Sequence, residues 1–443
     1  MAVWTGSELS NYFQTESGVK QGCLLSPLLF ALYLNDLHEF LGGGLDIGNM
    51  NIRLLMYADD IVLLADDPKI LQEMIDRLEI YCTMWNMEIN LTKSEILVFR
   101  KGGKLARNET WTLHEQEINI VSEYCYLGVI LTPKMSFSKH VEHRSSSAKS
   151  SINSTWNNFF RKKNLSLKAK WKLFKAACRA IQTYGAQVWG FKFFEEVNKL
   201  QRYFIKRILK LPSFTPNYCL WLETGIEETH FFTLDLHLRY LMRVFFEFTN
   251  NRLPHVLASR VLSQNIFWAK ELNNIGESYG ITWNENSISA EEWNNKRYQL
   301  LEALKLDRRN EMENNAWRSV ARIYKALDFS KGLTYMIDEF SQNEITWIFK
   351  ARCGLICLNG NRFNQNDSKL CSMCNLRENE NTEHFIGRCP ILKEFRLRFL
   401  GKIQFTENEI INILNGHDNW ENLYKYIINA IKYRKELISE FNL

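Results

Sequence analysis

The sequence predicts an α+β amino-terminal region followed by a mostly helical remainder with a small metal-binding segment near its end. Two short apolar runs meet at a pair of acids near residue 60, a pattern typical of an antiparallel hairpin. Beyond residue 133, apolar residues recur mainly at helical spacing. A cluster of three cysteines and one histidine follows residue 370. Since 443 residues exceed the range of a single core, we expect two or three domains.

The composition is that of an ordinary soluble globular protein, with 46% hydrophobic and 24% charged residues. No run of 18 apolar residues is present, so we expect no membrane span. The first residues lack the basic-then-apolar pattern of a secretory signal. Most of the ten cysteines are scattered singly in apolar contexts, which indicates reduced thiols and a cytoplasmic or nuclear location.

The first sharply patterned stretch runs from Gly18 to Phe30. Ser26 followed by Pro27 predicts a helix start with Ser26 as the N-cap, and the leucines that follow predict a mostly buried helix. Gln21 and Gly22 precede this helix and would lie in a loop at its amino-terminal end. Such a loop suits contact with a phosphate or nucleotide, although similar loops are common in inert proteins.

The segment around Asp59 and Asp60 predicts a hairpin with both carboxylates at its tip. Neighbouring like charges repel, and apolar surroundings make their desolvation costly. A Mg²⁺ ion would relieve both problems, since it prefers carboxylate oxygens and leaves coordination positions open for substrate phosphates. A solvated turn is the alternative, because aspartate is common in turns.

Three further elements complete the predicted α+β region. Pro68 opens a helix to about Trp85, and the two acids before it, Asp66 and Asp67, are expected to cap that helix. A buried strand is predicted over the end of the segment 87–99, with Lys93 just before it, where a surface lysine is the default interpretation. The stretch 123–131 predicts another strand, in which Gly128 permits a bulge or a close backbone approach.

The net charge of +5 conceals a strongly basic segment. Residues 134–210 contain 18 lysines and arginines against three acids, a balance of +15, while the remainder has 37 basic and 47 acidic residues. A basic segment inside an otherwise acidic chain indicates a polyanionic partner. A first predicted helix places Lys168, Lys172, Lys175 and Arg179 on one face, and a second basic helix carries Arg202, Lys206, Arg207 and Lys210. Either face could instead be merely solvated.

The late cluster has the spacing C-x2-C-x9-H-x4-C, formed by Cys371, Cys374, His384 and Cys389. Three thiols and an imidazole satisfy the tetrahedral geometry of a structural Zn²⁺ site and leave no open catalytic position. His384 and Cys389 are expected on a short helix that stops at Pro390. Chance spacing of buried thiols is the alternative. Cys353 and Cys357 lack matching partners and are expected to be buried cysteines.

Four motifs in this order and spacing resemble the palm of reverse transcriptases, above all those of non-LTR (LINE-type, jockey-like) retrotransposons. They are residues 18–30, the box Tyr57-Ala58-Asp59-Asp60, the segment 90–99 and Tyr126-Leu127-Gly128. The resemblance implies that Gln21, Gly22 and Tyr57 lie against the incoming nucleotide and template. It makes Asp59 the principal Mg²⁺ ligand and Asp60 its neighbour, Lys93 the general acid toward pyrophosphate, and Tyr126, Leu127 and Gly128 the primer grip.

The same resemblance names the expected domains. It implies a partial palm over 1–132, a basic helical thumb that holds the template–primer backbone over 133–225, a helical connector over 226–345 and a zinc-knuckle region over 346–443. The implied chemistry is RNA-templated DNA synthesis from a DNA 3′-hydroxyl, with deoxynucleoside triphosphates and Mg²⁺. The implied partners are an RNA template and a DNA primer or target. Knuckles of this kind are thought to help bind RNA or target DNA.

One part of the family pattern has no counterpart here. Polymerisation by two metal ions needs carboxylates from two separate strands, and the family's other carboxylate lies upstream of the segment that matches Gly18. The 17 residues before Gly18 contain no aspartate. We therefore expect an amino-terminally truncated polymerase, inactive or nearly so by itself. The alternatives are a non-catalytic nucleic-acid-binding protein and an unstable remnant whose exposed sheet edge favours aggregation.

Overall fold

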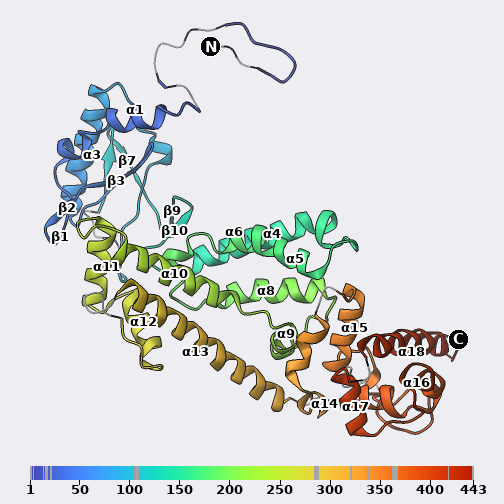
Figure 1. The fold of residues 1–443 in the computed structure, drawn as a ribbon. Helices are drawn as coiled ribbons and strands as arrows, with labels where there is room; N and C mark the ends of the chain where they lie inside the picture. The colour runs from blue at the N-terminus through green and yellow to red at the C-terminus, as the bar shows by residue number, and fades with distance from the viewer. Residues whose placement is uncertain are drawn as a thin grey trace. The chain divides into compact units, whose positions relative to one another are not determined.

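The computed structural model describes the chain except for residues 1, 3, 13, 15–17, 20–21, 104, 106–108, 284–288, 320–321, 337–338, 362–367, 418 and 442–443. It divides into two compact units, Met1–Ser136 and Phe137–Leu443 (Figure 1). The structure is 57% helical with small sheets, which agrees with the predicted α+β class. The end of the first unit lies close to the boundary expected at residue 132, while the functional names given to the segments stay predictions.

The first unit combines short helices with small two-stranded ladders. All ladders in its described part are antiparallel except the parallel pair β5–β8. Its elements are α1 (Ser26–Tyr33), α2 (Leu37–Leu41), β1 (Leu45–Ile47), β2 (Met50–Ile52), β3 (Leu54–Tyr57), β4 (Asp60–Leu63), α3 (Pro68–Met84), η1 (Leu91–Lys93), β5 (Glu95–Ile96), β6 (Thr112–Leu113), β7 (Gln116–Glu117), β8 (Asn119–Ile120), β9 (Tyr124–Tyr126) and β10 (Val129–Leu131).

The predicted hairpin is formed by β3 and β4, in a register that pairs Leu54 with Leu63 and Tyr57 with Asp60. Its turn therefore consists of Ala58 and Asp59 alone. Ala58 has a φ of 55°, in the left-handed region that favours glycine, so its side chain makes this conformation costly. Both acids lie at or beside this tight turn because the apolar residues of the two strands fix the register.

Helix α3 positions the hairpin by packing on it. Asp67 caps this helix, since its carboxylate accepts the backbone N–H groups of Lys69 at 2.7 Å and Ile70 at 3.4 Å. The buried residues of α3 enter two small cores, one around Tyr81 that includes Ile61 and one around Ile75 that includes Leu63. The predicted capping by Asp67 and the start of the helix at Pro68 are confirmed.

Helix α1 differs from its prediction in two respects. Leu25 is the N-cap and already has helical dihedrals, so Ser26 lies inside the first turn and does not cap it. The helix also buries none of its residues: Leu28, Leu29 and Leu32 are all more than half exposed, whereas the following Leu34 is buried. Periodicity identified the helix but not what covers it.

Two predicted strands are also different in the structure. The segment before residue 99 pairs only at Glu95–Ile96, as β5. The stretch 123–131 is not one strand with a bulge but the hairpin β9–β10, which turns at Leu127 and Gly128. Both turn residues have positive φ, 47° and 77°, which matches the twist of a two-residue hairpin.

The second unit is helical throughout its described part. Its elements are α4 (Ser138–Thr155), the π-helix η2 (Trp156–Phe160), α5 (Leu167–Leu173), the π-helix η3 (Phe174–Arg179), α6 (Ala180–Gln182), α7 (Ala186–Trp189), α8 (Glu195–Ile208), α9 (Asn217–Thr224), α10 (Thr229–Phe246), α11 (Leu253–Ser263), α12 (Trp268–Glu277), α13 (Ala290–Trp317), α14 (Arg322–Lys325), η4 (Phe329–Tyr335), α15 (Gln342–Arg352), η5 (Asn359–Asn361), the π-helix η6 (His384–Arg388), η7 (Pro390–Leu392), α16 (Lys393–Leu400), α17 (Glu407–Leu414) and α18 (Trp420–Phe441).

One hydrophobic core runs through most of this unit. It joins Ile152 of α4 and Phe204 of α8 to Ile348 of α15, and it continues to Cys389 and to Ala430 of α18. Helices α10 and α13 lie side by side (Figure 1). Helix α7 packs against α10, and α9 packs against α13. The cysteine-rich segment thus belongs to the same packed body as the basic helices. The divisions expected at 225/226 and 345/346 stay predictions.

A buried charge cluster crosses this core. Arg352, at the end of α15, donates from Nε to Glu223 Oε2 of α9 at 2.7 Å, and both side chains are fully buried. Tyr335 of η4 donates to the same carboxylate oxygen at 2.6 Å. The guanidinium also donates to the backbone carbonyl oxygens of Asp328 and Leu414. One side chain thereby connects α9, η4, α15 and the end of α17.

Among the described residues, each helix is either too short or too polar to span a bilayer.

The buried His237 of α10 predicts an acid-sensitive fold. Its Nδ1–H donates to the Gln187 carbonyl at 2.7 Å, and Nε2 has no hydrogen-bond partner among the described residues. Burial lowers the pKa of His237 to about 4. Because the folded state takes up its proton less readily than the unfolded state, stability is retained above pH ~6.5 and lost as the pH falls toward 4, by about 3 kcal/mol from this group.

The measurement is urea unfolding of the wild type and His237→Gln between pH 7 and pH 4. We expect a flatter pH profile for the variant, because glutamine does not titrate. His143→Gln, at an exposed position of α4, is the matched control and should follow the wild type. Parallel profiles for the wild type and His237→Gln would exclude His237 as the source of acid sensitivity.

Candidate functional site

The two predicted catalytic acids lie at the tip of the β3–β4 hairpin. Asp59 occupies the second turn position and Asp60 begins β4, and both side chains are exposed. Tyr57 stands opposite Asp60 in the ladder and is 65% exposed. The turn therefore presents two adjacent carboxylates to solvent, where a cation can reach either of them directly.

The structure brings this tip close to the predicted primer grip. Burial raises the pKa of the Tyr126 hydroxyl, and the charge of Asp60 raises it further. The same two causes raise the pKa of Tyr124, with Glu95 contributing as well. Two motifs that are more than 60 residues apart in the chain thus act on one another electrostatically. Leu127 and Gly128 form the turn of that second hairpin.

The remaining predicted polymerase residues are less closely gathered. Gly22 is exposed with a φ of 80°, and Gln21 lies outside the described residues. Lys93 is exposed at the end of η1, directly before β5, and no described contact joins it to Asp59. The roles assigned to these residues stay predictions.

Asp59 and Asp60 belong to no group of three or more potential metal ligands in the described part of the chain. Within the described part of the chain, only the group at residues 371–389 brings together three or more histidine, cysteine or acidic side chains closely enough to hold an ion. Two-metal chemistry needs carboxylates from separate strands, so Asp59 and Asp60 require a further carboxylate to complete it.

The first basic helix is interrupted. The predicted helix 166–183 is composed of α5, the π-helix η3 and α6, with Ser166 capping it by accepting the Ala169 N–H at 3.2 Å. In a π-helix the hydrogen bonds span five residues, so a spacing of three or four no longer keeps one face. Lys168 and Lys172 are exposed on α5, whereas Lys175 and Arg179 on η3 are half-buried.

Two of the predicted backbone-binding cations have partners within the protein. The Arg179 guanidinium lies 3.9 Å from the centre of the Phe232 ring, and burial lowers its pKa. Arg202 pairs with Glu195 and lies 3.8 Å from Glu228. Lys206 is half-buried, and its ammonium group donates to the Ser213 carbonyl at 2.7 Å beside an open hollow.

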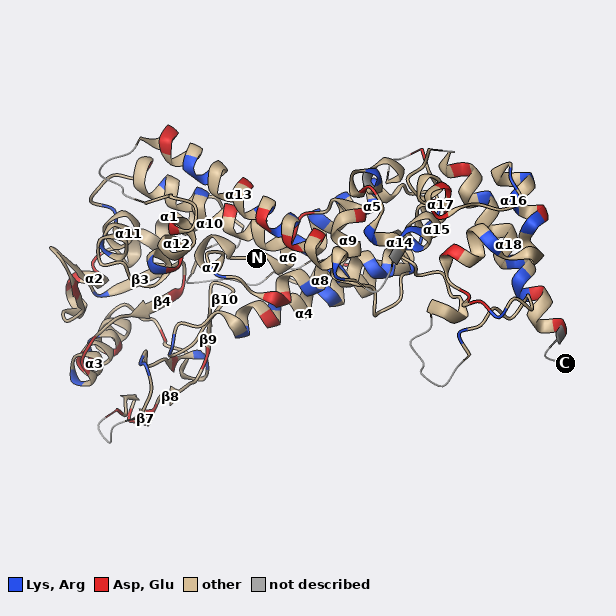
Figure 2. Cartoon of the chain, turned by 90° about the horizontal axis from the view of Figure 1, so that it is seen from below, with Lys and Arg blue, Asp and Glu red and all other residues tan. Residues whose placement is uncertain are grey.

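That hollow has a volume of about 430 Å³ and lies along α8, and four of the residues that line it are basic. It is lined by Lys199, Arg202, Tyr203, Lys206, Arg207, Leu211 and Ser213. Figure 2 shows basic positions along α5 and α8. Arg207 lies 3.8 Å from the centre of the Trp156 ring and donates to the Tyr203 hydroxyl at 2.9 Å, and Lys149 lies 5.1 Å from the centre of the Tyr203 ring.

Sequence reasoning placed Arg207 on the second basic helix but did not select Lys149 or Tyr203 as site residues. The four-residue spacing of Tyr203 and Arg207 was visible on the predicted helix. Their association with Lys149 and Trp156 depends on the packing of α4 and η2 beside α8, which no local pattern indicates.

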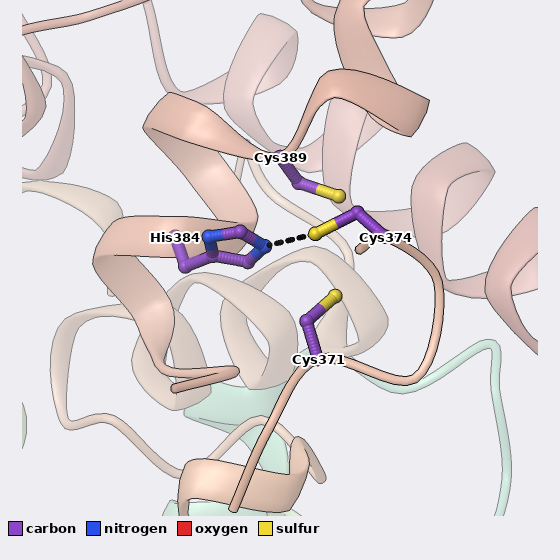
Figure 3. A group of neighbouring side chains, drawn as sticks. All are labelled: Cys371, Cys374, His384 and Cys389. Carbon is purple, nitrogen blue, oxygen red and sulfur yellow. Dashed lines mark hydrogen bonds between the residues drawn. The ribbon is translucent and has the colours of Figure 1, made fainter. Parts of the chain in front are cut away.

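The four predicted zinc ligands converge (Figure 3). One ligand atom from each of Cys371, Cys374, His384 and Cys389 lies within 4.8 Å of all the others. His384 Nε2 lies 3.4 Å from Cys374 Sγ. Cys371, His384 and Cys389 are buried and Cys374 is half-buried.

Backbone contacts hold the two halves of this group. The Cys371 N–H donates to the Glu378 carbonyl at 2.9 Å, beside an antiparallel bridge between Leu370 and Asn379. His384 begins the π-helix η6, and the Cys389 N–H donates to the His384 carbonyl at 2.8 Å. The predicted short helix before Pro390 is therefore confirmed. Of the two unmatched cysteines, Cys353 is buried as expected but Cys357 is exposed.

The donor set fits Zn²⁺. With Zn–S bonds of about 2.3 Å, the ligand atoms of a tetrahedral site lie roughly 3.8 Å apart. The four ligand atoms in the structure all lie within 4.8 Å of one another. The thiols and the imidazole would close all four positions, so the ion would be structural.

The metal-binding loop is also tied to the C-terminal helix. Arg434 of α18 donates from Nε to Glu380 Oε1 at 2.7 Å, and Glu380 is fully buried. The Cys371 thiol lies 3.9 Å from the same oxygen. The Arg434 guanidinium compensates the charge of this buried carboxylate.

Comparisons with known proteins agree with the motifs. Residues 3–131 match the family model described as "Reverse transcriptase (RNA-dependent DNA polymerase)". The chain is 29% identical over 204 residues to the RNA-directed DNA polymerase from mobile element jockey of Drosophila funebris, which covers 44% of the chain and 22% of that protein. It is 26% identical over 209 residues to the probable RNA-directed DNA polymerase from transposon X-element of Drosophila melanogaster, covering 45% of the chain and 22% of the relative.

A further match is the Pol polyprotein from type-1 retrotransposable element R2 of Nasonia vitripennis, 32% identical over 123 residues, or 26% of the chain and 12% of that protein. The chain therefore spans about a fifth or less of the length of these relatives. The predicted relationship to non-LTR retrotransposon polymerases is confirmed.

The metal group predicts one Zn²⁺ per chain. Metal analysis of the purified protein should give about one equivalent, and Cys371→Ser should reduce it to near zero because three ligands seldom hold a structural ion. Chelation should lower the thermal midpoint by about 5 °C or more. Cys357→Ser, exposed and outside the group, is the control and should retain the metal.

Proposed function

Because residues 3–131 match a reverse transcriptase domain, we propose that the chain is part of an RNA-directed DNA polymerase of a non-LTR retrotransposon. The observation that carries this proposal is the tip of the β3–β4 hairpin, where Asp59 and Asp60 are exposed side by side within the matched segment. Its substrates would be deoxynucleoside triphosphates, an RNA template and a DNA primer. The reduced state of its cysteines supports a cytoplasmic or nuclear location.

In this function Asp59 and Asp60 would hold Mg²⁺, which supplies activation of the primer 3′-hydroxyl and neutralisation of the triphosphate charge. The two-residue turn keeps both carboxylates at the tip of the hairpin. Tyr126, Leu127 and Gly128 would hold the primer terminus beside Asp60, and the electrostatic influence of Asp60 on Tyr126 supports this placement. Gly22 and Tyr57 would contact the nucleotide and template, and Lys93 would protonate the leaving pyrophosphate.

Residues 133–225 would hold the nucleic-acid backbone, as the thumb of the polymerase. Support comes from the exposed Lys168 and Lys172 on α5 and from the hollow on α8 beside Lys206. Contacts of this kind neutralise phosphates irrespective of sequence. Arg179 and Arg202 would contribute less, since Phe232, Glu195 and Glu228 already engage them. Binding without catalysis is the second candidate function, supported by the same surface.

The acid pair predicts a specific outcome in primer extension. The 443-residue polypeptide by itself should extend a DNA primer on an RNA template little or not at all, because a second strand must supply another carboxylate. When residues 18–131 replace the matching segment of a jockey-type polymerase, extension should appear. Asp59→Asn should then reduce its rate by on the order of 100-fold or more, since a ligand of the developing charge is lost.

Asp66→Asn is the matched control, because Asp66 is exposed beyond β4 and outside the tip. It should leave the extension rate unchanged. Strong Mg²⁺-dependent extension by the isolated polypeptide would show that its acid site is complete. Extension that survives Asp59→Asn in the grafted enzyme would remove Asp59 from the catalytic set.

The basic surface predicts a strong salt dependence of nucleic-acid binding. Charge removal by Lys168→Gln, Lys172→Gln and Lys206→Gln together should reduce the slope of log K against log salt by about 2 to 3, at roughly 0.7–0.9 per lost phosphate contact. Filter binding over a range of salt concentrations measures this slope.

The corresponding control changes Lys425, Lys432 and Lys435 of α18 to glutamine and should leave the slope as in the wild type. A triple variant on α5 and α8 whose slope equals that of the wild type would mean that nucleic acid binds elsewhere.

A further inference from the structure

Glu378 lies in the loop between Cys374 and His384, and it was not among the predicted ligands. Its carboxylate oxygen Oε2 accepts a hydrogen bond from His384 Nδ1 at 3.0 Å. The same oxygen lies 3.3 Å from Arg388 Nε. Glu378 is partly exposed, whereas His384 is completely buried, so the contact reaches from the surface into the metal group.

The contact decides which ring nitrogen faces the metal group. In a neutral imidazole one nitrogen carries the proton and the other is an acceptor. A hydrogen bond from Nδ1–H to Glu378 leaves the lone pair on Nε2, and Nε2 is the atom that lies 3.4 Å from Cys374 Sγ (Figure 3). Histidine ligands in proteins characteristically donate their other ring N–H to such an acceptor, which fixes their orientation.

We propose that Glu378 is a positioning residue of the Cys3His site, which holds His384 as the Nδ1–H tautomer so that Nε2 binds the ion. Glu378 touches no ion itself, and its effect passes through the imidazole. A carboxylate on Nδ1 also makes Nε2 more basic and hence a stronger ligand.

The fold holds Glu378 in this position from two sides. Its backbone carbonyl accepts the Cys371 N–H at 2.9 Å, so the residue lies directly across from a ligand. Its side chain meets Arg388 from η6, the helix that also bears His384. The second acid of the loop has a different part: Glu380 is fully buried and paired with Arg434 of α18. Among the described residues outside the four ligands, only Glu378 is hydrogen-bonded to the His384 imidazole.

The test compares the Zn²⁺ affinity of the wild-type full chain, Glu378→Gln and Glu378→Leu by competition with a chromogenic chelator. Co²⁺ absorption reports the ligand geometry. We expect the wild type to bind one ion and Glu378→Leu to bind it about 10- to 100-fold more weakly. Glu378→Gln, which retains an amide oxygen as acceptor, should lie between them. The d–d bands of the Co²⁺-loaded Glu378→Leu variant should weaken or shift, because His384 is no longer held.

Glu383→Gln is the matched control, since Glu383 is another acid beside η6 and its ion-pair partner among the described residues is Arg388, at 3.8 Å. It should bind Zn²⁺ as the wild type does. Thermal melting of the metal-free proteins provides a second control: equal midpoints for the wild type and Glu378→Leu exclude general loss of stability as the cause of weaker binding.

Because the proposal rests on the metal site proposed above, the outcomes must separate the two. A wild type that binds no equivalent of Zn²⁺ overturns the site itself. A wild type that binds one equivalent, with an affinity that Glu378→Leu leaves within twofold, overturns the positioning role alone and makes the contact a surface ion pair with Arg388. Equal weakening by Glu383→Gln overturns it as well.

Discussion

The ion pair between Glu223 and Arg352 is the contact on which the helical unit most depends. Both side chains are fully buried, and the guanidinium also reaches the carbonyl oxygens at Asp328 and Leu414. A buried charge without its partner costs several kcal/mol, so α9 and α15 must meet in this one arrangement. The cluster thereby specifies how the segment with the basic helices packs against the segment with the metal group. Glu223 Oε1 has no hydrogen-bond partner among the described residues, which leaves the pairing with Arg352 as its main compensation.

Metal ligands and basic helices consequently belong to one body. Cys371 and Cys389 lie in the same hydrophobic core as Phe174 and Phe204, which are buried residues of η3 and α8. A retroviral-type knuckle is expected to be a small module on its own, yet here Arg434 ties the metal loop to α18 through Glu380. An ion at this site would therefore act on the shape of the whole unit, including the surface proposed to hold nucleic acid, without touching that surface.

The tip of the β3–β4 hairpin, in contrast to these buried groups, is exposed to solvent. Asp59 and Asp60 are exposed, Tyr57 is largely exposed, and Ala58 has a left-handed conformation that costs free energy. A strained backbone beside exposed acids is typical of a functional site that is completed by another group, because packing within the unit does not compensate for the strain. The leucines of α1 are similarly exposed. Both features lie within the segment that matches the reverse transcriptase family model.

Much of this was determined by the sequence itself, because it depends on neighbours in the chain. Alternating apolar runs specified the acid hairpin, Asp67 and Pro68 specified the start of α3, and cysteine spacing specified the four converging ligands. Only the tertiary structure decided which cations remain available: Arg202 is paired and Arg179 is half-buried, because Glu228 and Phe232 reach them from distant segments. It also decided that Asp60 at the tip of β3–β4 lies close enough to Tyr126 of β9 to raise the pKa of its hydroxyl, and that Glu378 accepts a hydrogen bond from His384. A side chain's partner across the fold depends on how whole elements pack, and periodicity along the chain contains no record of that packing.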